Sequence, residues 1–391
     1  MRTLVTLLTL FCSLAAATGL EAQAVRQTKV PWEDKFRQLD EIWPTANNYR
    51  TASGAPGHNY WQQRADYVIK IALDEKDREL TGAATITYTN NSPDTLRYVW
   101  LNMDQNRFAG DSKYVAQRRS DGDNKESYGT LRGGYGHRDG DFGFKVKKVS
   151  DSAGQDLNHT VVDTLMRVDL PAPLQAGGQT SFTVTWSHKI IEGEIYFGRG
   201  GYEHFEDDDN DIFQIAQWYP RLAVYSDNEG WHQQSFLGSS EFTLQFGDFD
   251  VEITVPDDHI VAATGVLQNT DSVLTSEQQA RLKQAETAET PVMIVNQQEA
   301  VRNESSKSKR NKTWHFKAEN VRDFAWASSR KFQWDAQGYQ TRDDRMVMAM
   351  SYYPKEASPL WDLYSTASQI HSMDVFGDKI FPYPYPVMSS V

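Results

Sequence analysis

The stretch YVIKIALDEKDRELTGAATITYT, residues 67–89, decides the fold of this 391-residue chain. Apolar side chains recur at every second position in both of its halves: Tyr67, Ile69, Ile71 and Leu73, and then Ala84, Ile86 and Tyr88. A period of two turns one face of a strand toward the core and the other toward solvent. The stretch therefore predicts two half-buried strands of an antiparallel sheet.

The same alternation returns along most of the chain. Further strand patterns, separated by turn residues, occur at Leu96–Trp100, Lys145–Val149, Val161–Leu170, Phe182–Trp186, Phe242–Phe246 and Phe249–Val255. Many short alternating strands joined by turns are typical of all-β domains. We expect a mainly β, antiparallel domain over residues 64–340.

The pattern changes after Asp335. Met346–Tyr353 is a nearly continuous apolar run, which indicates a strand covered on both faces. Ser358 followed by Pro359 is typical of a helix start. The residues that follow share one helical face: Leu360, Leu363, Tyr364, Ala367, Ile370 and His371. We expect a helix to about residue 375, then an extended FPYPYPV segment leading into a strand that the chain leaves unfinished, with a domain boundary near residue 340.

The first 24 residues have the features of a secretory signal peptide. Arg2 precedes an apolar run from Leu4 to Ala17, and Ala22-Gln23-Ala24 supplies a small-residue cleavage site. The run is too short to span a membrane. It contains Cys12, the single cysteine of the chain, so we expect a mature protein without disulfides. The sequence thus predicts an exported protein, periplasmic or secreted, without a transmembrane segment after signal removal and with an N-terminal extension at 25–63.

The charge of the chain argues against one class of partner. The formal net charge is −13 at pH 7, and no basic patch of domain size is visible. Binding to nucleic acid or to an anionic membrane surface depends on such patches. We therefore expect no nucleic-acid partner.

The stretch from Asp211 to His232, DIFQIAQWYPRLAVYSDNEGWH, combines amides, aromatic rings and a guanidinium. Gln214 and Gln217 precede Trp218, Tyr219, Pro220 and Arg221. Such a set suits recognition of a polar group in a partly dry pocket. The alternative is a core strand and its turn, with Arg221 in a structural ion pair, and residue types alone favour this alternative.

Other motifs offer no complete catalytic set. Zinc hydrolysis from a helix requires H-E-x-x-H, and none of the nine histidines satisfies it. His371 and Asp374 share a mostly apolar helical face, for which a structural role is favoured. The carboxylates of Glu206–Asp211, EDDDND, lack the order of a calcium loop and indicate a solvated acidic loop.

Three connecting segments are assigned by composition. Asp111–Gly143 is rich in Gly, Ser, Arg and Asp and is expected to be a long surface insertion without a phosphate-binding loop. Ser276–Glu286 is expected to be a surface helix that begins at its serine. Asn303–Lys312, NESSKSKRNK, is expected to be a polar hairpin tip.

In six segments, taken in order, the sequence resembles the secreted bacterial branch of the aminopeptidase N (membrane alanyl aminopeptidase) family of zinc gluzincins. They are YVIKIALDEKDRELTGAATITYTNNSPDTL, QIAQWYPRLAVYSD, DFDVEITVP, VAATG, DFAWASS and YYPKEASPLWDLYSTASQIHSMDVFGDKIFPYPYP. Together they extend from about Tyr60 to Val391. The resemblance implies a β-saddle domain followed by the start of a thermolysin-like α+β catalytic domain at 341–391.

The resemblance also implies a function and a site. In the family, a strand after a segment like FPYPYPV carries G-x-M-E-N, which holds the substrate's free amine, and a later H-E-x-x-H helix binds zinc. Val391 precedes both motifs, so zinc is expected for the intact protein but not for this chain, which should be inactive alone. The saddle residue that contacts the peptide amino terminus matches Gln217, or alternatively Gln214, with Tyr219 and Arg221 beside it.

A second function stays open at this point. A non-catalytic exported β-sandwich module could bind peptide or carbohydrate through exposed aromatic residues. The sequence following Val391 would distinguish the two functions, because the enzyme requires both missing motifs.

Overall fold

A computed structural model of the chain describes residues 46–117, 128, 140–196, 198–238 and 243–391. These residues belong to two compact units, Met1–Tyr60 and Trp61–Val391. The predicted signal peptide, most of the N-terminal extension and much of the Asp111–Gly143 insertion lie outside the described residues. Within the part that is described, no helix combines the length and the hydropathy needed to cross a membrane.

The first unit is described from residue 46 to Tyr60. A bridge pairs Arg50 with Pro56, and the guanidinium of Arg50 lies 5.2 Å from the centre of the Tyr60 ring. The backbone amides of Tyr49 and Arg50 both donate to the side chain of Asn47 at 2.8 Å. These contacts form a compact turn held by local hydrogen bonds.

The largest sheet of the second unit has seven strands in the order β15-β17-β13-β1-β2-β7-β4. Their bounds are β1 Arg64–Asp74, β2 Glu79–Thr89, β4 Lys145–Asp151, β7 Gln179–Lys189, β13 Gly247–Pro256, β15 Val266–Leu267 and β17 Asn311–Val321. All neighbours are antiparallel except β1 and β13. Burial alternates along β1 and β2, which confirms the two strands predicted from residues 67–89.

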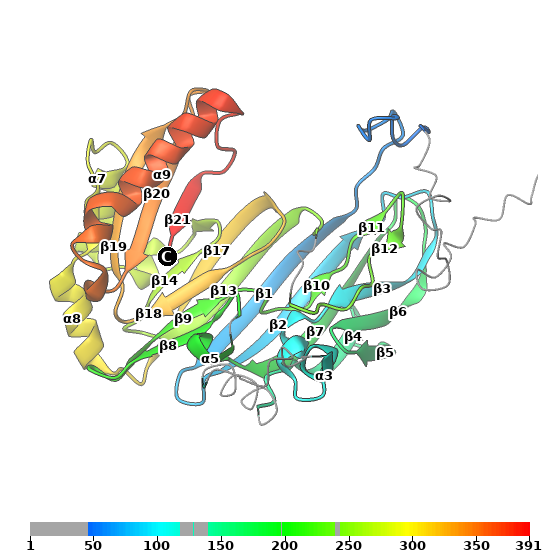
Figure 1. Cartoon of the computed structure of the whole chain (residues 1–391), viewed down its shortest axis with the longest axis horizontal. Coiled ribbons are helices and arrows are strands. Elements are labelled where there is room, and N and C mark those ends of the chain that lie inside the picture. Colours follow the sequence, from blue (N-terminus) through cyan, green and yellow to red (C-terminus); the bar gives the residue numbers. More distant parts are fainter. Residues whose placement is uncertain (1–45, 118–127, 129–139, 197, 239–242) are drawn as a thin grey trace, which may run out of the picture. The chain divides into compact units, whose positions relative to one another are not determined.

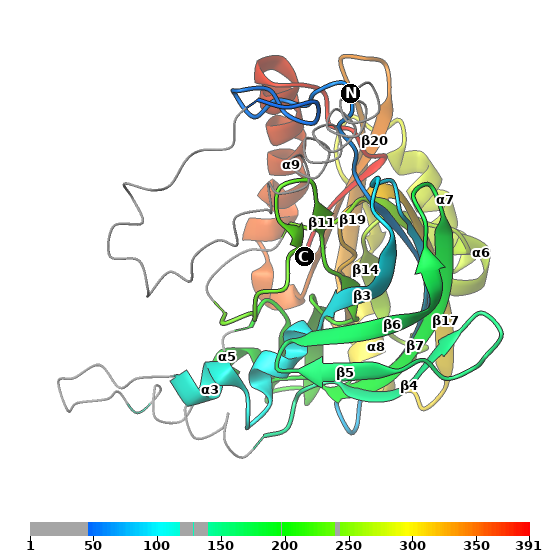
Figure 2. The same cartoon turned by 90° about the vertical axis from the view of Figure 1, so that its right-hand side faces the viewer.

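A second sheet of four strands, in the order β10-β3-β6-β5, shares its core with the first. Its strands are β3 Leu96–Asn102, β5 His159–Val162, β6 Leu165–Leu174 and β10 Arg221–Leu222. Figure 2 shows β3 and β6 stacked in front of the larger sheet. The Tyr67 hydroxyl of β1 accepts a hydrogen bond from the backbone of Leu222 at 2.9 Å, so it links the two sheets directly.

A third sheet, in the order β14-β18-β9-β8, carries the stretch that begins at Asp211. Its strands are β8 Gly201–Phe205, β9 Asn210–Ile215, β14 Ile260–Ala263 and β18 Trp326–Ser329. A two-stranded ribbon follows, β11 Tyr225–Ser226 and β12 Gly230–Trp231. The short helical segments between these strands are η1 Asp104–Phe108, α3 Lys113–Gln117, α5 Gly193–Tyr196 and α6 Thr270–Val273.

The fourth sheet, β16-β19-β20-β21, is accompanied by helices (Figure 1). Its strands are β16 Val292–Val295, β19 Gln333–Gln340, β20 Met346–Tyr353 and β21 Val387–Ser390, and its helices are α7 Ser276–Ala285, α8 Gln297–Ser306, η2 Lys355–Ala357 and α9 Leu360–Lys379. Strand β21 returns parallel to β20 after α9. The structure thus confirms a mainly β, mostly antiparallel fold with an α+β segment at its C-terminal end, whereas the boundary near residue 340 stays a prediction.

The helix α9 packs on β19 and β20 through a face other than the one that the sequence indicates (Figure 1; Figure 2). Its buried residues are Thr366, Gln369 and Met373. Thr366 donates to the buried carboxylate of Asp335 at 2.5 Å, and Gln369 donates to the carbonyl of Met350 at 2.9 Å. Polar side chains therefore anchor the helix to the sheet.

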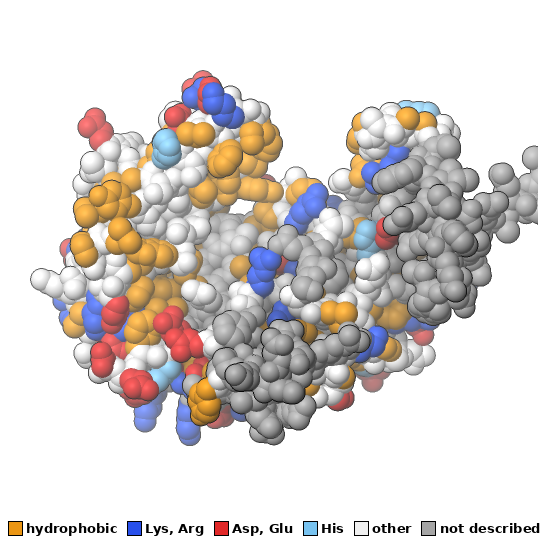
Figure 3. Space-filling view, in the orientation of Figure 1, with side chains coloured by type: hydrophobic (Ala, Val, Ile, Leu, Met, Phe, Trp, Pro, Cys, Tyr) orange, Lys and Arg blue, Asp and Glu red, His pale blue; other side chains and the backbone are white. Residues whose placement is uncertain are grey.

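Apolar side chains remain exposed on α9 as a result. Leu360, Leu363 and Tyr364 are 63%, 62% and 59% exposed, and hydrophobic side chains are visible on the surface of this region (Figure 3). The predicted face groups these residues with Ile370, which is half-buried. A period of 3.6 identifies an apolar stripe but does not say which side of the helix meets the sheet.

Helix α7 begins at Ser276, as predicted, and the preceding Thr275 caps it, because its side chain accepts from the Gln278 backbone. Two other local predictions are wrong in detail. The predicted hairpin tip at Asn303–Lys312 is the last turn of α8, which a capping box between Asn296 and Glu299 initiates, together with the connection to β17 and its first two residues. No side chain caps the first turn of α9, since the residue before Leu360 is a proline.

Candidate functional site

A cavity of about 1200 Å³ lies where three sheets of the second unit approach one another. One wall is the end of β9, Gln214 to Ala216, and a second is the β14–β15 turn. The end of β17 and its connection to β18 form a third wall. The fourth is the segment Tyr383–Val391.

Gln214 faces this cavity. It is the exposed residue of β9, whose other residues are all buried. Phe213 and Ile215 point to the opposite face of the strand because successive side chains alternate. The Gln214 amide is therefore available to a ligand in the cavity.

Gln217 follows the wall directly but is not among the residues that line it. Its side chain is half-buried, and its backbone has φ +55°, in the left-handed region that non-glycine residues rarely adopt. The next residue, Trp218, is fully buried and donates from its indole nitrogen to the Phe324 carbonyl at 2.8 Å. Gln217 thus lies at a sharp change of direction next to a fixed anchor.

Tyr219 and Arg221 are buried behind the wall and do not line the cavity. The Tyr219 hydroxyl donates to Asp323 Oδ1 at 2.7 Å, and Arg221 Nη1 donates to Asp323 Oδ2 at 2.6 Å. Arg221 also contacts both carboxylate oxygens of Asp104 at 3.0 and 2.9 Å. Asp323 does line the cavity, so the two residues act on it through this carboxylate.

The environment of this cluster fixes its charge states. Burial raises the pKa of the Tyr219 hydroxyl well above its usual range, and the neighbouring Asp323 adds to this effect. Burial works against the charge of Arg221, but Asp104 and Asp323 outweigh it and raise the pKa of the guanidinium. Tyr219 is therefore a neutral hydrogen-bond donor and Arg221 a permanent cation at any physiological pH.

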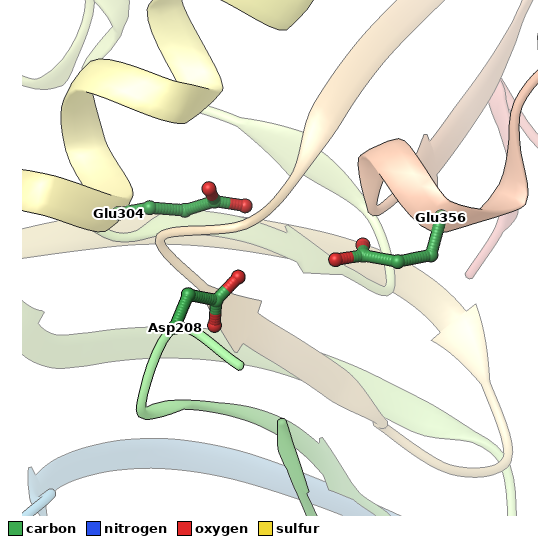
Figure 4. A group of neighbouring side chains, drawn as sticks. All are labelled: Asp208, Glu304 and Glu356. Atoms are coloured by element: carbon green, nitrogen blue, oxygen red, sulfur yellow. The ribbon is translucent and has the colours of Figure 1, made fainter. Parts of the chain in front are cut away.

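One group of carboxylates among the described residues is close enough to share a metal ion: Asp208, Glu304 and Glu356, which converge in Figure 4. Two ammonium groups already lie among them. Lys331, which is fully buried, contacts all three carboxylates, and Lys355 contacts Asp208 at 3.1 Å and Glu304 at 2.6 Å. We read this group as an ion-pair network that joins the β8–β9 turn, α8 and η2.

The same network corrects part of the interpretation of EDDDND as a solvated loop: Glu206, Asp207 and Asp209 are exposed as expected, but Asp208 and Asp211 are not. Asp208 is bound to Lys331 and Lys355, and the Asp211 carboxylate accepts from Arg78 at 2.9 Å. The network does not fit a catalytic zinc ion, because it contains no histidine and its carboxylates are already neutralised. No step of a reaction is therefore assigned to a metal on these residues.

The four predicted site residues are close in the sequence but lie at two different places relative to the cavity. Gln214 and Gln217 lie at or beside the cavity, whereas Tyr219 and Arg221 support Asp323 from behind. Sequence reasoning missed Asp323, although it is the first residue of the DFAWASS segment. It also missed Asp104, for which no sequence pattern gives a signal.

The comparisons with known proteins gave structural likenesses only. No model of a protein family matches the sequence, and no curated protein matches it. An M1 zinc metallopeptidase from Deinococcus radiodurans is similar in structure, with 14% identity, a TM-score of 0.47, and coverage of 84% of this chain and 55% of that chain. A mutant of this metallopeptidase bound to a Tyr-Ser-Ala substrate is also similar, with 13% identity and a TM-score of 0.47. The alignment covers 84% of this chain and 56% of that chain.

A two-domain M1 zinc metallopeptidase mutant bound to L-tryptophan is also similar, with 12% identity and a TM-score of 0.46. The alignment covers 86% of this chain and 58% of that one. The chain thus spans little more than half of the length of the solved structures that it resembles.

Proposed function

We propose that the chain is the N-terminal part of an exported zinc-dependent aminopeptidase of the aminopeptidase N type, and that its cavity receives the amino terminus of a peptide. One observation carries the proposal. Residues 214–216 of the QIAQWYPR segment and residues 383–387 of the FPYPYPV segment, after which the resemblance expects the amine-binding motif, line the same cavity although they are far apart in the chain. This agreement supports a shared site.

The cavity is lined by the cations Arg199, Lys317 and Arg322, but its acceptor groups suit an ammonium ligand. The side-chain amide of Gln214 offers an oxygen that accepts from an N–H donor. Asp323 contributes a carboxylate that Tyr219 and Arg221 hold in one orientation. Trp326 and Tyr385 add aromatic surface to the lining, which lowers the local polarity and strengthens such contacts.

The chemistry of hydrolysis would come from zinc, which activates a water molecule for attack on the peptide bond when bound in an intact enzyme. The described residues supply no fitting ligand set. We therefore propose that this chain by itself binds peptide amino termini without cleaving them. Its signal-like first 24 residues support an exported location.

Calorimetric titration with L-alaninamide and N-acetyl-L-alaninamide tests the proposal. The two ligands differ in the ammonium group, so the free amine should bind at least about tenfold more tightly, as expected for a charge-assisted hydrogen bond. Equal affinity would contradict a site for peptide amino termini and would favour a general binding module. Tight stoichiometric zinc together with activity on an aminoacyl anilide would contradict the proposed lack of cleavage.

A further inference from the structure

The backbone of Gln217 needs support. A non-glycine residue with φ +55° is less stable than the same residue in an ordinary conformation, and it persists where its surroundings hold it. The direction of the Gln217 side chain depends on this conformation. Whatever holds the backbone therefore also sets the direction in which this side chain leaves the chain.

Gln105, a buried residue of η1, makes the contact that meets this need. Its side-chain nitrogen Nε2 donates to the carbonyl oxygen of Gln217 at 3.0 Å and lies 3.4 Å from the carbonyl oxygen of Ala216. Carbonyl oxygens only accept, so the amide must present its NH₂ group to them. Two consecutive carbonyls are thus held by one side chain, at the residue where the chain turns.

The flanks of Gln217 are fixed as well. A side chain at Gly200 would place its Cβ 2.7 Å from the Gln214 carbonyl oxygen and 2.8 Å from the Ala216 nitrogen, so the backbone there packs directly against glycine. On the other side, the Trp218 indole is bonded inside the core. Between these two fixed points, the Gln105 side chain binds the carbonyl of Gln217 itself.

We propose that Gln105 is a positioning residue of the candidate site: by binding the carbonyls of Ala216 and Gln217 it keeps Gln217 in the left-handed conformation and so holds the backbone of the Gln214–Ala216 wall, from which the Gln214 amide faces the cavity. Its use in binding rests on the proposed function. The adjacent Asp104 binds Arg221, so η1 secures the segment at both ends.

Hydrogen–deuterium exchange of residues 214–221 tests the positioning directly. Gln105→Met keeps the length of the side chain but removes the donor, and it should accelerate exchange there about tenfold, the factor for one hydrogen bond. Gln369→Met is the matched control, since Gln369 is another buried glutamine that donates to a backbone carbonyl. The control should leave exchange of 214–221 unchanged.

A second background separates positioning from general destabilisation. Glycine adopts positive φ at little cost, so in Gln217→Gly chains the Gln105→Met change should accelerate exchange of 214–221 far less. Equal acceleration in both backgrounds, or none in either, would overturn the proposal. Should Gln105→Met not fold, Gln105→Asn, whose amide is one methylene too short to reach, replaces it with the same expectations.

Ligand binding is measured on the same variants. If L-alaninamide binds the unmodified chain more tightly than N-acetyl-L-alaninamide, Gln105→Met should weaken the first about tenfold and leave the second unchanged. Unchanged binding of L-alaninamide would overturn a role in recognition. If the unmodified chain does not discriminate between the ligands, the proposed function fails, and the exchange experiment alone decides whether Gln105 positions Gln217.

Discussion

Replacing Arg221 by methionine is expected to destabilise the second unit strongly. The guanidinium is 5% exposed and is shared between Asp104, which is 1% exposed, and Asp323, which is 40% exposed. Without it, Asp104 becomes a buried carboxylate with no cation beside it. Breaking a buried ion pair by removing one partner costs about 3–5 kcal/mol.

The contribution of Asp323 should be much smaller. Because solvent screens its half-exposed carboxylate, the loss of this pair costs less than about 1 kcal/mol. The Asp323→Asn variant therefore serves as the control, since it breaks the solvent-facing half of the cluster and leaves the Asp104 pair intact.

Differential scanning calorimetry of the unmodified chain and both variants measures the difference. One kcal/mol lowers the Tm of a domain of this size by about 2 °C, so Arg221→Met should lower it by about 6–10 °C and Asp323→Asn by no more than about 2 °C. Equal losses in the two variants would refute the assignment of the cost to Asp104. The burial of Asp104 would then cost less, without its cation, than a buried carboxylate usually does.

Three further expectations concern charged groups. Burial opposes the charge of Glu75, but His259 and Arg330 outweigh it and lower the pKa of this carboxyl to about 2. The Glu75 carboxylate therefore stabilises the fold fully above about pH 4.3, and this contribution is lost as the pH falls toward 2. A Glu75→Gln chain should lose less stability than the unmodified chain in urea titrations from pH 5 to 2. Burial lowers the pKa of Lys312 to about 8. Between pH 8 and about 10.4 this lysine is therefore protonated in the unfolded chain but largely neutral in the folded one. Stability should rise with pH across this window in the unmodified chain but not in Lys312→Met, as urea titrations would show. The buried Lys331 neutralises three carboxylates, so Lys331→Met should cost about 3–5 kcal/mol by denaturant unfolding, and an unchanged midpoint would contradict the ion-pair network.

The strands could be predicted from the sequence, but their neighbours could not. Alternation along residues 67–89 reflects burial of one face, which is a local property. The parallel pairing of β1 with β13 depends on how distant segments pack, and nothing in either strand encodes it. Helix α8 was missed because its composition is polar, although the capping pair Asn296 and Glu299 was a local signal for it.

The same distinction applies to the site. Gln214 and Gln217 could be singled out because their segment is unusual in composition. The partners of Arg221 lie 117 and 102 residues away in the chain. The sequence therefore could not decide whether Arg221 binds a ligand or forms a structural ion pair. Left-handed backbone at Gln217 could not be foreseen either, since such conformations usually select glycine or asparagine.

The Asp104–Arg221 pair is a poor source of stability for so buried a position. Replacing a buried ion pair by apolar residues of similar volume is often neutral or stabilising by about 1–4 kcal/mol. Its retention is better explained by geometry, because Arg221 fixes the Asp323 carboxylate at the edge of the cavity. We therefore expect an Asp104→Leu/Arg221→Met chain to match the unmodified chain in Tm while binding L-alaninamide more weakly, by about tenfold for one charge-assisted contact. If this double variant is as stable and binds as tightly, the pair has no positioning role and Asp323 needs no support from Arg221.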